Sequence, residues 1–144
     1  MKKILFICTG NTCRSPMAEA IFNEKAKSEK LPACASSCAL SSPIPQQISE
    51  NAKQALNDIG IDFSHTSKQV SEEDIKNADM IFGITHSHAK ILCDIFPEHS
   101  DKIYSFPSDI SDPFGCDLDV YKKCRDEITD GVNLIIKYLK ENEK

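Results

Sequence analysis

Ile7-Cys8-Thr9-Gly10-Asn11-Thr12-Cys13-Arg14-Ser15-Pro16 is the stretch around which this chain is organised. It follows an apolar run at residues 4–7, which is typical of a buried parallel strand. It precedes residues 17–22, whose composition predicts a helix, with Ser15 as the N-cap and Pro16 in the first turn, where proline is tolerated. The sequence therefore predicts a cysteine at the end of a strand, then a short loop, then an arginine where a helix begins.

The predicted loop has the residues of an anion-binding site. Backbone N–H groups of a tight loop and of a helix N-terminus attract a phosphate, and Arg14 can hold two of its oxygens. Cys8 would then lie beneath the phosphorus as a thiolate, in line for nucleophilic attack. We expect Gly10 to relieve crowding, Asn11 to accept a left-handed conformation and brace the loop, and Ser15 to donate its hydroxyl to the sulfur. A core cysteine with a surface arginine is the alternative, but the position between a strand and a helix favours a phosphate site.

The loop resembles a known signature. Residues 8–16 are similar to the phosphate-binding loop of the low-molecular-weight protein tyrosine phosphatase family, and residues 112–115 are similar to the Asp-Pro pair that precedes its last helix. The two motifs and their spacing extend the resemblance over nearly the whole chain. It implies a phosphatase that acts on phosphorylated proteins through a cysteinyl-phosphate intermediate. The residues carried over are Cys8, Arg14 and Asp112 for catalysis, and Thr9, Gly10, Asn11, Thr12, Cys13 and Ser15 for the phosphate-binding loop.

Asp112 is the residue expected to protonate the leaving group. A thiolate that attacks phosphorus expels an alkoxide, a phenolate or an amine, and a carboxylic acid on a loop over the site can supply the proton. Asp112 precedes a proline that stiffens the turn, within a long loop at 105–117. An ordinary Asp-Pro turn is the alternative interpretation. Three other acidic residues lie nearby but do not precede proline: Asp109, Asp117 and Asp119.

Two departures from the tyrosine-specific members of the family concern the substrate. Those members tend to have an aliphatic residue in place of Thr12, and a second aromatic residue where Gly115 follows Phe114. We therefore expect Thr12 and Phe114 to determine specificity, with Phe114 as one wall of the substrate slot. The bacterial protein arginine phosphatase subgroup shares the threonine, the Asp-Pro-Phe-Gly sequence and a helix start like residues 119–121, which implies phosphoarginine as the substrate. Phosphotyrosine is the alternative, with the threonine as a mere isosteric filler.

The chain has seven cysteines, an odd number, and no secretory signal, which favours reduced thiols in a reducing compartment. Cys34 and Cys38 are expected to be small buried residues. Cys13 has two open interpretations. It is either a small side chain packed under the loop, or a redox residue that forms a reversible disulfide with Cys8 and shields it from over-oxidation. The resemblance supports the redox role.

A serine and two histidines are further candidates for smaller roles. The resemblance implies that a serine in the loop after the second strand supports Asn11, and Ser42 is the candidate, with Ser41 as the alternative. His86 and His88 form a His-x-His pair near a helix start, but helix positions two apart face different directions and no third ligand accompanies them. We therefore expect no metal site and no cofactor.

Size and charge set further limits. A chain of 144 residues, 40% hydrophobic and 27% charged, fits one phosphatase domain over residues 1–144. Its net charge of −5 argues against nucleic acid as a partner. There is no apolar run near the roughly 20 residues that span a bilayer and no signal-peptide pattern, so we expect a cytoplasmic protein without a membrane partner. A monomer is expected.

The remaining pattern alternates strands and helices, which predicts an α/β fold with a four-stranded parallel sheet in a three-layer α/β/α, Rossmann-like arrangement. Strands are expected at 33–39, 80–84 and 102–105. Helices are expected at 47–59, after Ser71, from a Thr85 cap to Phe96, and from Asp119, with Val120, Cys124, Ile128, Val132, Ile135 and Leu139 on one face. Ligands of such sheets bind beyond the carboxyl ends of the strands, where Cys8 is expected.

Two other classes of function compete with a phosphatase. An arsenate reductase uses the same fold and a similar loop, but it needs a relay of two further cysteines after the third strand. This chain offers only Cys93 there, with Cys116 far along. A non-catalytic phosphate-binding module is the other class, and it has no use for a nucleophile or an acid.

Overall fold

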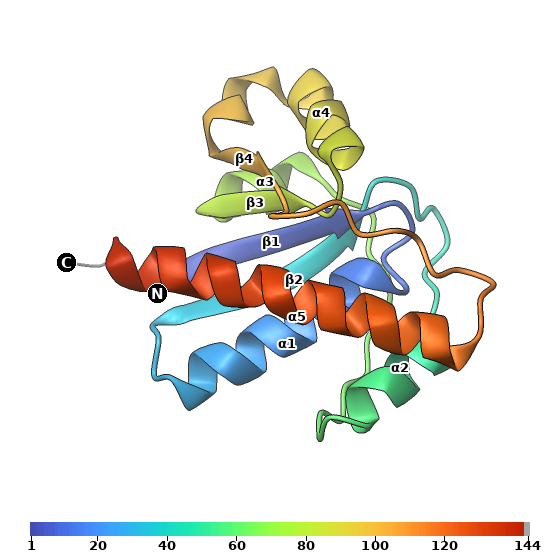
Figure 1. Cartoon of the computed structure of the whole chain (residues 1–144). Helices are drawn as coiled ribbons and strands as arrows, with labels where there is room; N and C mark the ends of the chain where they lie inside the picture. Colours follow the sequence, from blue (N-terminus) through green and yellow to red (C-terminus); the bar gives the residue numbers. More distant parts are fainter. Residues whose placement is uncertain (143–144) are drawn as a thin grey trace.

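Four parallel strands form the central sheet, in the spatial order β2-β1-β3-β4 (Figure 1). The computed structural model describes residues 1–142. Along the chain the elements are β1 (Lys2–Cys8), α1 (Arg14–Ser28), β2 (Ala33–Ala39), α2 (Glu50–Asn57), α3 (Glu72–Asn77), β3 (Met80–Gly83), α4 (His86–Ile95), η1 (Pro97–Lys102), β4 (Ile103–Ser105) and α5 (Leu118–Glu141). The predicted α/β class and four-stranded parallel sheet are confirmed. Within residues 1–142, no helix has the length and apolar character that crossing a membrane requires.

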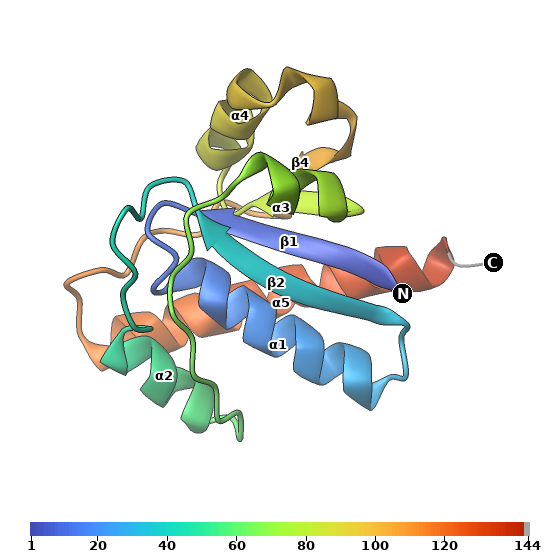
Figure 2. The same ribbon diagram turned by 180° about the vertical axis from the view of Figure 1, so that it is seen from behind.

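Helices cover both faces of the sheet. α1, α2 and α5 lie on one side, and α3 and α4 lie on the other (Figures 1 and 2). In β1, Ile4 and Phe6 belong to the core on the side of α1 and α5, whereas Leu5 and Ile7 belong to the core on the side of α3 and α4. Successive strand side chains point to opposite faces, and both faces are buried here. This is why the strand reads as an unbroken apolar run.

The strand register brings three strand ends to one edge of the sheet. Cys8 of β1 lies opposite Ala39 of β2, and Ile7 lies opposite Gly83 of β3. Gly83 also lets α4 pack against the end of β3, because a Cβ there would lie 2.4 Å from the backbone nitrogen of Ala89. The loops that follow these three strands therefore meet around Cys8.

Two short helices begin as the sequence predicts. Ser71 caps α3 and Thr85 caps α4, and each forms a capping box with the residue three positions later, Asp74 and His88. The side chain of each cap residue accepts from the backbone N–H of its partner, and the partner side chain accepts from the backbone N–H of the cap residue. These reciprocal bonds fix the first turn of each helix.

The prediction that Ser15 caps α1 is wrong. The N-cap is Cys13, which makes no capping hydrogen bond through its side chain, and Ser15 lies within the first turn. Asn11 adopts a positive φ of 58°, so the loop reverses direction quickly and the helix starts at Arg14. The Ser15 hydroxyl is thereby free to contact the site, as described below.

The predicted starts of α2 and α5 also need correction. α2 begins at Glu50 rather than at 47, because residue 47 forms an antiparallel bridge with Thr66 and Ser49 is the N-cap. α5 begins one residue before Asp119, because Asp117 accepts the capping hydrogen bond. The prediction that Val120 lies on the buried face is also wrong, because 43% of its surface is exposed, whereas the other five predicted positions are buried.

Candidate active site

A pocket of about 250 Å³ lies at the carboxyl end of β1, where sequence and fold both predict the site. The loop between β1 and α1 (Figure 2) supplies most of the residues that line this pocket. The loop after β4 contributes Asp112 and Phe114, and the loop after β2 contributes Gln46. The predicted residues that line this pocket are Cys8, Thr9, Gly10, Asn11, Thr12, Cys13, Arg14, Asp112 and Phe114.

Cys8 and Ser15 are in hydrogen-bond contact at the loop. The Cys8 Sγ lies 2.9 Å from the Ser15 Oγ, and the Cys8 side chain borders both the pocket and the core. The Asn11 Nδ2 donates a hydrogen bond of 2.8 Å to the same Ser15 oxygen. Because that bond occupies a lone pair of Ser15, the serine keeps its own proton for donation to the sulfur. The arrangement can stabilise a thiolate at Cys8.

Asn11 is completely buried and braces the loop through both ends of its amide. Its Nδ2 also donates to the Ser37 Oγ at 2.9 Å. Its Oδ1 accepts from the backbone N–H of Lys68 at 3.1 Å and from the His65 Nε2 at 2.8 Å. Burial lowers the pKa of His65 below its ordinary value, so its ring is neutral near pH 7. Because the Asn11 Oδ1 can only accept, the proton of this neutral ring is on Nε2.

The serine that supports Asn11 is therefore Ser37, and the prediction of Ser42 or Ser41 is wrong. The Ser42 hydroxyl instead lies 2.7 Å from the Ser67 hydroxyl. Ser37 is in the interior of β2, opposite Phe6 in the register with β1. Its hydroxyl donates to Glu19 of α1 at 2.7 Å.

Arg14 is fixed from the acid-bearing loop. Only 6% of its surface is exposed, and its Nη1 donates to the backbone oxygen of Ile110 at 2.9 Å. Its Nη2 lies 3.7 Å from the Asp112 Oδ2. The guanidinium is thus held at the rim of the pocket, next to the carboxylate that the sequence predicts as the acid.

The three other acidic residues have different positions. The Asp109 Oδ1 accepts from the backbone N–H of His86 at 2.9 Å, and Asp117 caps α5. Asp119 is exposed in the first turn of α5. Asp112 lines the pocket, with half of its side chain exposed, and accepts from the backbone N–H of Phe114 at 3.1 Å. Of these four acidic residues, Asp112 is the one that lines the pocket together with Cys8.

Thr12 and Phe114, which both line the pocket, differ in how far they are exposed to solvent. Thr12 is half-buried, and its backbone oxygen accepts from the N–H of Ser49 at 2.9 Å, which ties the loop to the start of α2. Phe114 is 70% exposed, and Gly115 after it has a φ of +79° and open space around it. The mouth is consequently open on the side of Phe114.

Cys13 packs beneath the loop. Its Sγ lies 3.4 Å from the hydroxyl of Tyr121 and 3.5 Å from that of Ser49. Burial, followed by the contact with Cys13, raises the pKa of Tyr121 to about 12, so its phenol stays protonated at neutral pH. These contacts support the packing interpretation of Cys13, and the redox role stays a prediction.

The histidines contribute contacts that the sequence reasoning missed. His88 is buried, and its Nε2 lies 2.9 Å from the Thr9 Oγ1, while its Nδ1 accepts from the backbone N–H of Thr85 at 3.2 Å. Both ring nitrogens of His88 are therefore engaged, which leaves none for a metal ion. The signal in the sequence was the position of His88 three residues after a threonine that caps a helix.

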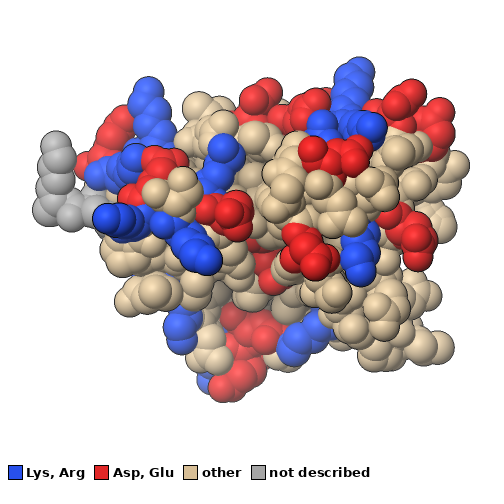
Figure 3. All heavy atoms as spheres, turned by 90° about the horizontal axis from the view of Figure 1, so that it is seen from below, with Lys and Arg blue, Asp and Glu red and all other residues tan. Residues whose placement is uncertain are grey.

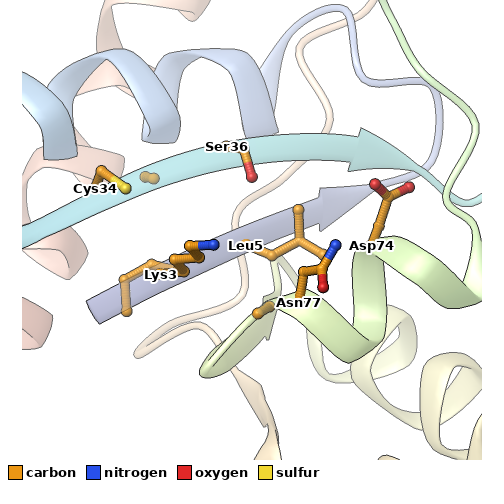
Figure 4. A pocket seen from close by; sticks show the side chains of 9 residues that line it. Lys3, Leu5, Cys34, Ser36, Asp74 and Asn77 are labelled. Carbon is orange, nitrogen blue, oxygen red and sulfur yellow. The ribbon is translucent and has the colours of Figure 1, made fainter. Parts of the chain in front are cut away.

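A second hollow lies on the face of the sheet that α3 covers (Figure 4). It has a volume of about 150 Å³, and the labelled residues that line it are Lys3, Leu5, Cys34, Ser36, Asp74 and Asn77. Cys34 is exposed there, so the prediction that it is buried is wrong, whereas Cys38 is buried as predicted. Asp74 is already bound to Ser71 and Lys68. This hollow lacks the combination of nucleophile, cation and loop amides that the first pocket has.

The surface around the fold has no strong charge of one sign on the face drawn in Figure 3, where basic and acidic side chains are intermingled. With a net charge of −5, the chain does not attract anions over its whole surface. An anion in the pocket would therefore depend on the local field of the loop amides, the start of α1 and Arg14.

Comparison with known proteins gives a consistent result. Residues 3–144 match the family model described as "Low molecular weight phosphotyrosine protein phosphatase". A protein-arginine-phosphatase from Bacillus subtilis is 34% identical over 98% of this chain and 99% of its own length. An arsenate reductase from Brevibacillus brevis is 34% identical over 88% of each chain.

Two solved structures have the same fold over nearly the full length. One is the YwlE arginine phosphatase in which a cysteine-to-serine mutant carries a phosphorylated active site serine, with a TM-score of 0.94, 34% identity, and coverage of 98% of this chain and 97% of that chain. The other is a low molecular weight protein tyrosine phosphatase from T. tengcongensis, with a TM-score of 0.92, 38% identity, and coverage of 96% and 99%.

Proposed function

This chain belongs to the low molecular weight phosphotyrosine protein phosphatase family, and on that premise we propose that it dephosphorylates proteins through a cysteinyl-phosphate, with phosphoarginine as the preferred substrate. The observation that carries the proposal is the contact of 2.9 Å between the Cys8 sulfur and the Ser15 hydroxyl. It lies at the floor of a pocket that has Arg14 and Asp112 at its rim. A nucleophile, a cation and an acid around one anion-sized space are what phosphoryl transfer requires.

In the first step the Cys8 thiolate attacks phosphorus. An S–P bond forms while the bond from phosphorus to the substrate nitrogen breaks, and Asp112 gives its proton to that nitrogen. The loop amides and Arg14 stabilise the charge on the equatorial oxygens. The YwlE structure, in which a serine that replaces a cysteine of the active site is phosphorylated, supports the assignment of Cys8 as the nucleophile.

In the second step water hydrolyses the intermediate. Asp112, now a carboxylate, takes a proton from the water, an O–P bond forms and the S–P bond breaks. The Ser15 hydroxyl, 2.9 Å from the sulfur, stabilises the departing thiolate. Phosphate is released and Asp112 is again protonated for the next turnover.

The preference for phosphoarginine rests on Thr12 and on the open mouth. The Thr12 side chain offers a hydroxyl to a polar guanidinium, directly or through water, and its position in the loop is fixed by the contact with Ser49. Gly115 leaves one side of the pocket open, where a second aromatic residue would hold a phenyl ring. The likeness to the Bacillus subtilis protein-arginine-phosphatase over nearly the full length also supports this substrate.

Arsenate reduction fits the cysteines of this chain less well, although five relatives are named arsenate reductases. That activity needs further thiols that can reach the nucleophile. Cys93 packs against the core on the side of α3 and α4, whereas Cys8 belongs to the core on the other side of the sheet. Cys116 is exposed in the loop before α5. We therefore favour hydrolysis over thiol relay chemistry.

The decisive experiment compares two substrates on the wild type and on Cys8→Ser. We expect the wild type to release phosphate from a phosphoarginine peptide with a higher kcat/KM than from the matched phosphotyrosine peptide, and the variant to release none. Cys34→Ser, at an exposed cysteine across the sheet, is the control and should equal the wild type. Full activity of Cys8→Ser would disprove the mechanism, and a higher kcat/KM for phosphotyrosine would disprove the substrate. Arsenate-dependent thiol oxidation that requires Cys93 would instead establish the reductase.

We also propose that residues 1–144 act as one domain, as a monomer in the cytoplasm. Cys8, Arg14 and Asp112 of a single chain line the same pocket, which supports a monomer. The mechanism requires a free thiolate at Cys8, which a reducing compartment maintains. Sedimentation of the purified protein tests the monomer.

A further inference from the structure

The first turn of α4 contacts both loops that build the pocket. The His88 ring lies 2.9 Å from the hydroxyl of Thr9, the residue directly after Cys8. Two residues earlier, the backbone N–H of His86 donates to Asp109 at 2.9 Å, on the loop that carries Asp112. One turn of helix therefore bridges the loop of the nucleophile and the loop of the acid.

The hydrogen bonds of His88 determine where its proton lies. The backbone N–H of Thr85 can only donate, and it points at the ring Nδ1 at 3.2 Å, so Nδ1 carries a lone pair. The proton of the neutral ring is then on Nε2, which donates to the Thr9 Oγ1. The direction of this bond is set by the cap of α4, and it leaves the Thr9 hydroxyl proton free for another acceptor.

The surroundings keep the ring neutral. Burial, and then the positive charge of Arg14, lower the pKa of His88 to about 4, while the carboxylates of Asp112 and Asp109 act weakly in the opposite direction. A charged ring would carry a proton on Nδ1 as well, so Nδ1 could no longer accept from the backbone N–H of Thr85. At neutral pH the ring is therefore neutral, and its Nε2 is the donor to Thr9.

We propose that His88 is a positioning residue for the phosphatase reaction, because its bond to Thr9 holds the loop segment next to Cys8 in the orientation that attack on phosphorus requires. The inference rests on the proposed function. Thr9 is exposed in the pocket and its side chain has no other hydrogen bond among residues 1–142. Without His88, the Thr9 side chain loses its anchor to α4 and the loop can shift relative to the acid. A misplacement of about 1 Å at reacting atoms can cost on the order of 100-fold in rate.

The test separates the two nitrogens of the ring. In His88→Asn, the amide oxygen can take over the cap acceptor near Thr85, but the side chain is too short to reach Thr9. In His88→Gln, the longer amide can donate to Thr9, but it fits the cap less well. We expect kcat to fall about tenfold in His88→Asn with KM changed less than about twofold, and to recover in His88→Gln. The thermal unfolding midpoint should be higher in His88→Asn, which keeps the cap, than in His88→Gln, which fits the cap less well.

Thr9→Val removes the acceptor and should lower kcat as much as His88→Asn does, and the double variant should lose no more than either single variant. His99→Asn, at a histidine in η1 away from the pocket, is the matched control and should leave kcat unchanged. Equal losses of kcat in His88→Asn and His88→Gln, or an unchanged kcat in Thr9→Val, would overturn the proposal.

All variants are assayed with p-nitrophenyl phosphate as well as a phosphoarginine peptide. If the wild type hydrolyses only the aryl phosphate, the substrate assignment fails while the role of His88 is still measured.

Discussion

Removal of the Ser37 hydroxyl should weaken the fold and the site together. Ser37 is buried in β2, accepts from Asn11 at 2.9 Å and donates to the Glu19 carboxylate at 2.7 Å. A neutral hydrogen bond contributes about 1 kcal/mol to stability, and one to a charged group about 1.5–3 kcal/mol. The Glu19 side chain is 16% exposed, so water compensates part of the second loss. We expect Ser37→Ala to lower the free energy of unfolding by about 2.5 kcal/mol at pH 7.

The deficit should depend on pH through Glu19. Burial raises the pKa of Glu19 above its ordinary value of 4.5, and the hydrogen bond from Ser37 partly opposes this rise. A raised pKa in the folded state means that the stability contributed by the protonated form is lost as pH rises through that pKa. Ser37→Ala removes the opposing bond, so its penalty is larger at pH values above that raised pKa, where Glu19 is charged, than below it, where protonation of Glu19 relieves the penalty.

The assay is urea unfolding of the wild type and the variant at several pH values, combined with kcat on an aryl phosphate. Ser36→Ala, the neighbouring exposed serine of β2, is the matched control and should change neither quantity. Because Asn11 keeps its bonds to Ser15, His65 and Lys68, kcat should fall only about tenfold. Equal stability of the two variants at pH 7, or a deficit that grows as pH falls, would refute this reasoning.

Three further predictions concern the pocket itself. Asp112→Asn should lower kcat by roughly 10²–10⁴ and leave the binding of inorganic phosphate within about twofold, as steady-state kinetics and phosphate competition will measure. Thr12→Ile should raise the ratio of phosphotyrosine to phosphoarginine turnover, and an unchanged ratio would exclude Thr12 as the selector. Cys13→Ser should retain turnover, but after oxidation by peroxide and reduction by a thiol it should recover less activity than the wild type. Recovery equal to that of the wild type would leave Cys13 as a packing residue.

The sequence predicted the features that depend on neighbours along the chain. The apolar run before Cys8 and the helix after it predicted the strand, the loop and the location of the pocket. The caps at Ser71 and Thr85 were also correct, because a capping box involves residues only three apart. Local patterns of this kind carry their own signal, since the interacting groups are a few residues apart in any fold.

The tertiary structure decided which distant side chains complete the site. Asn11 meets Ser37 across 26 residues and His65 across 54, and Thr9 meets His88 across 79. In sequence, a serine in the loop after β2 and a serine within β2 are equally suitable partners for Asn11. The register that sets Ser37 opposite Phe6 makes Ser37, within β2, the actual partner. That register arises from hydrogen bonds and packing over the whole sheet, so no short stretch of sequence contains it.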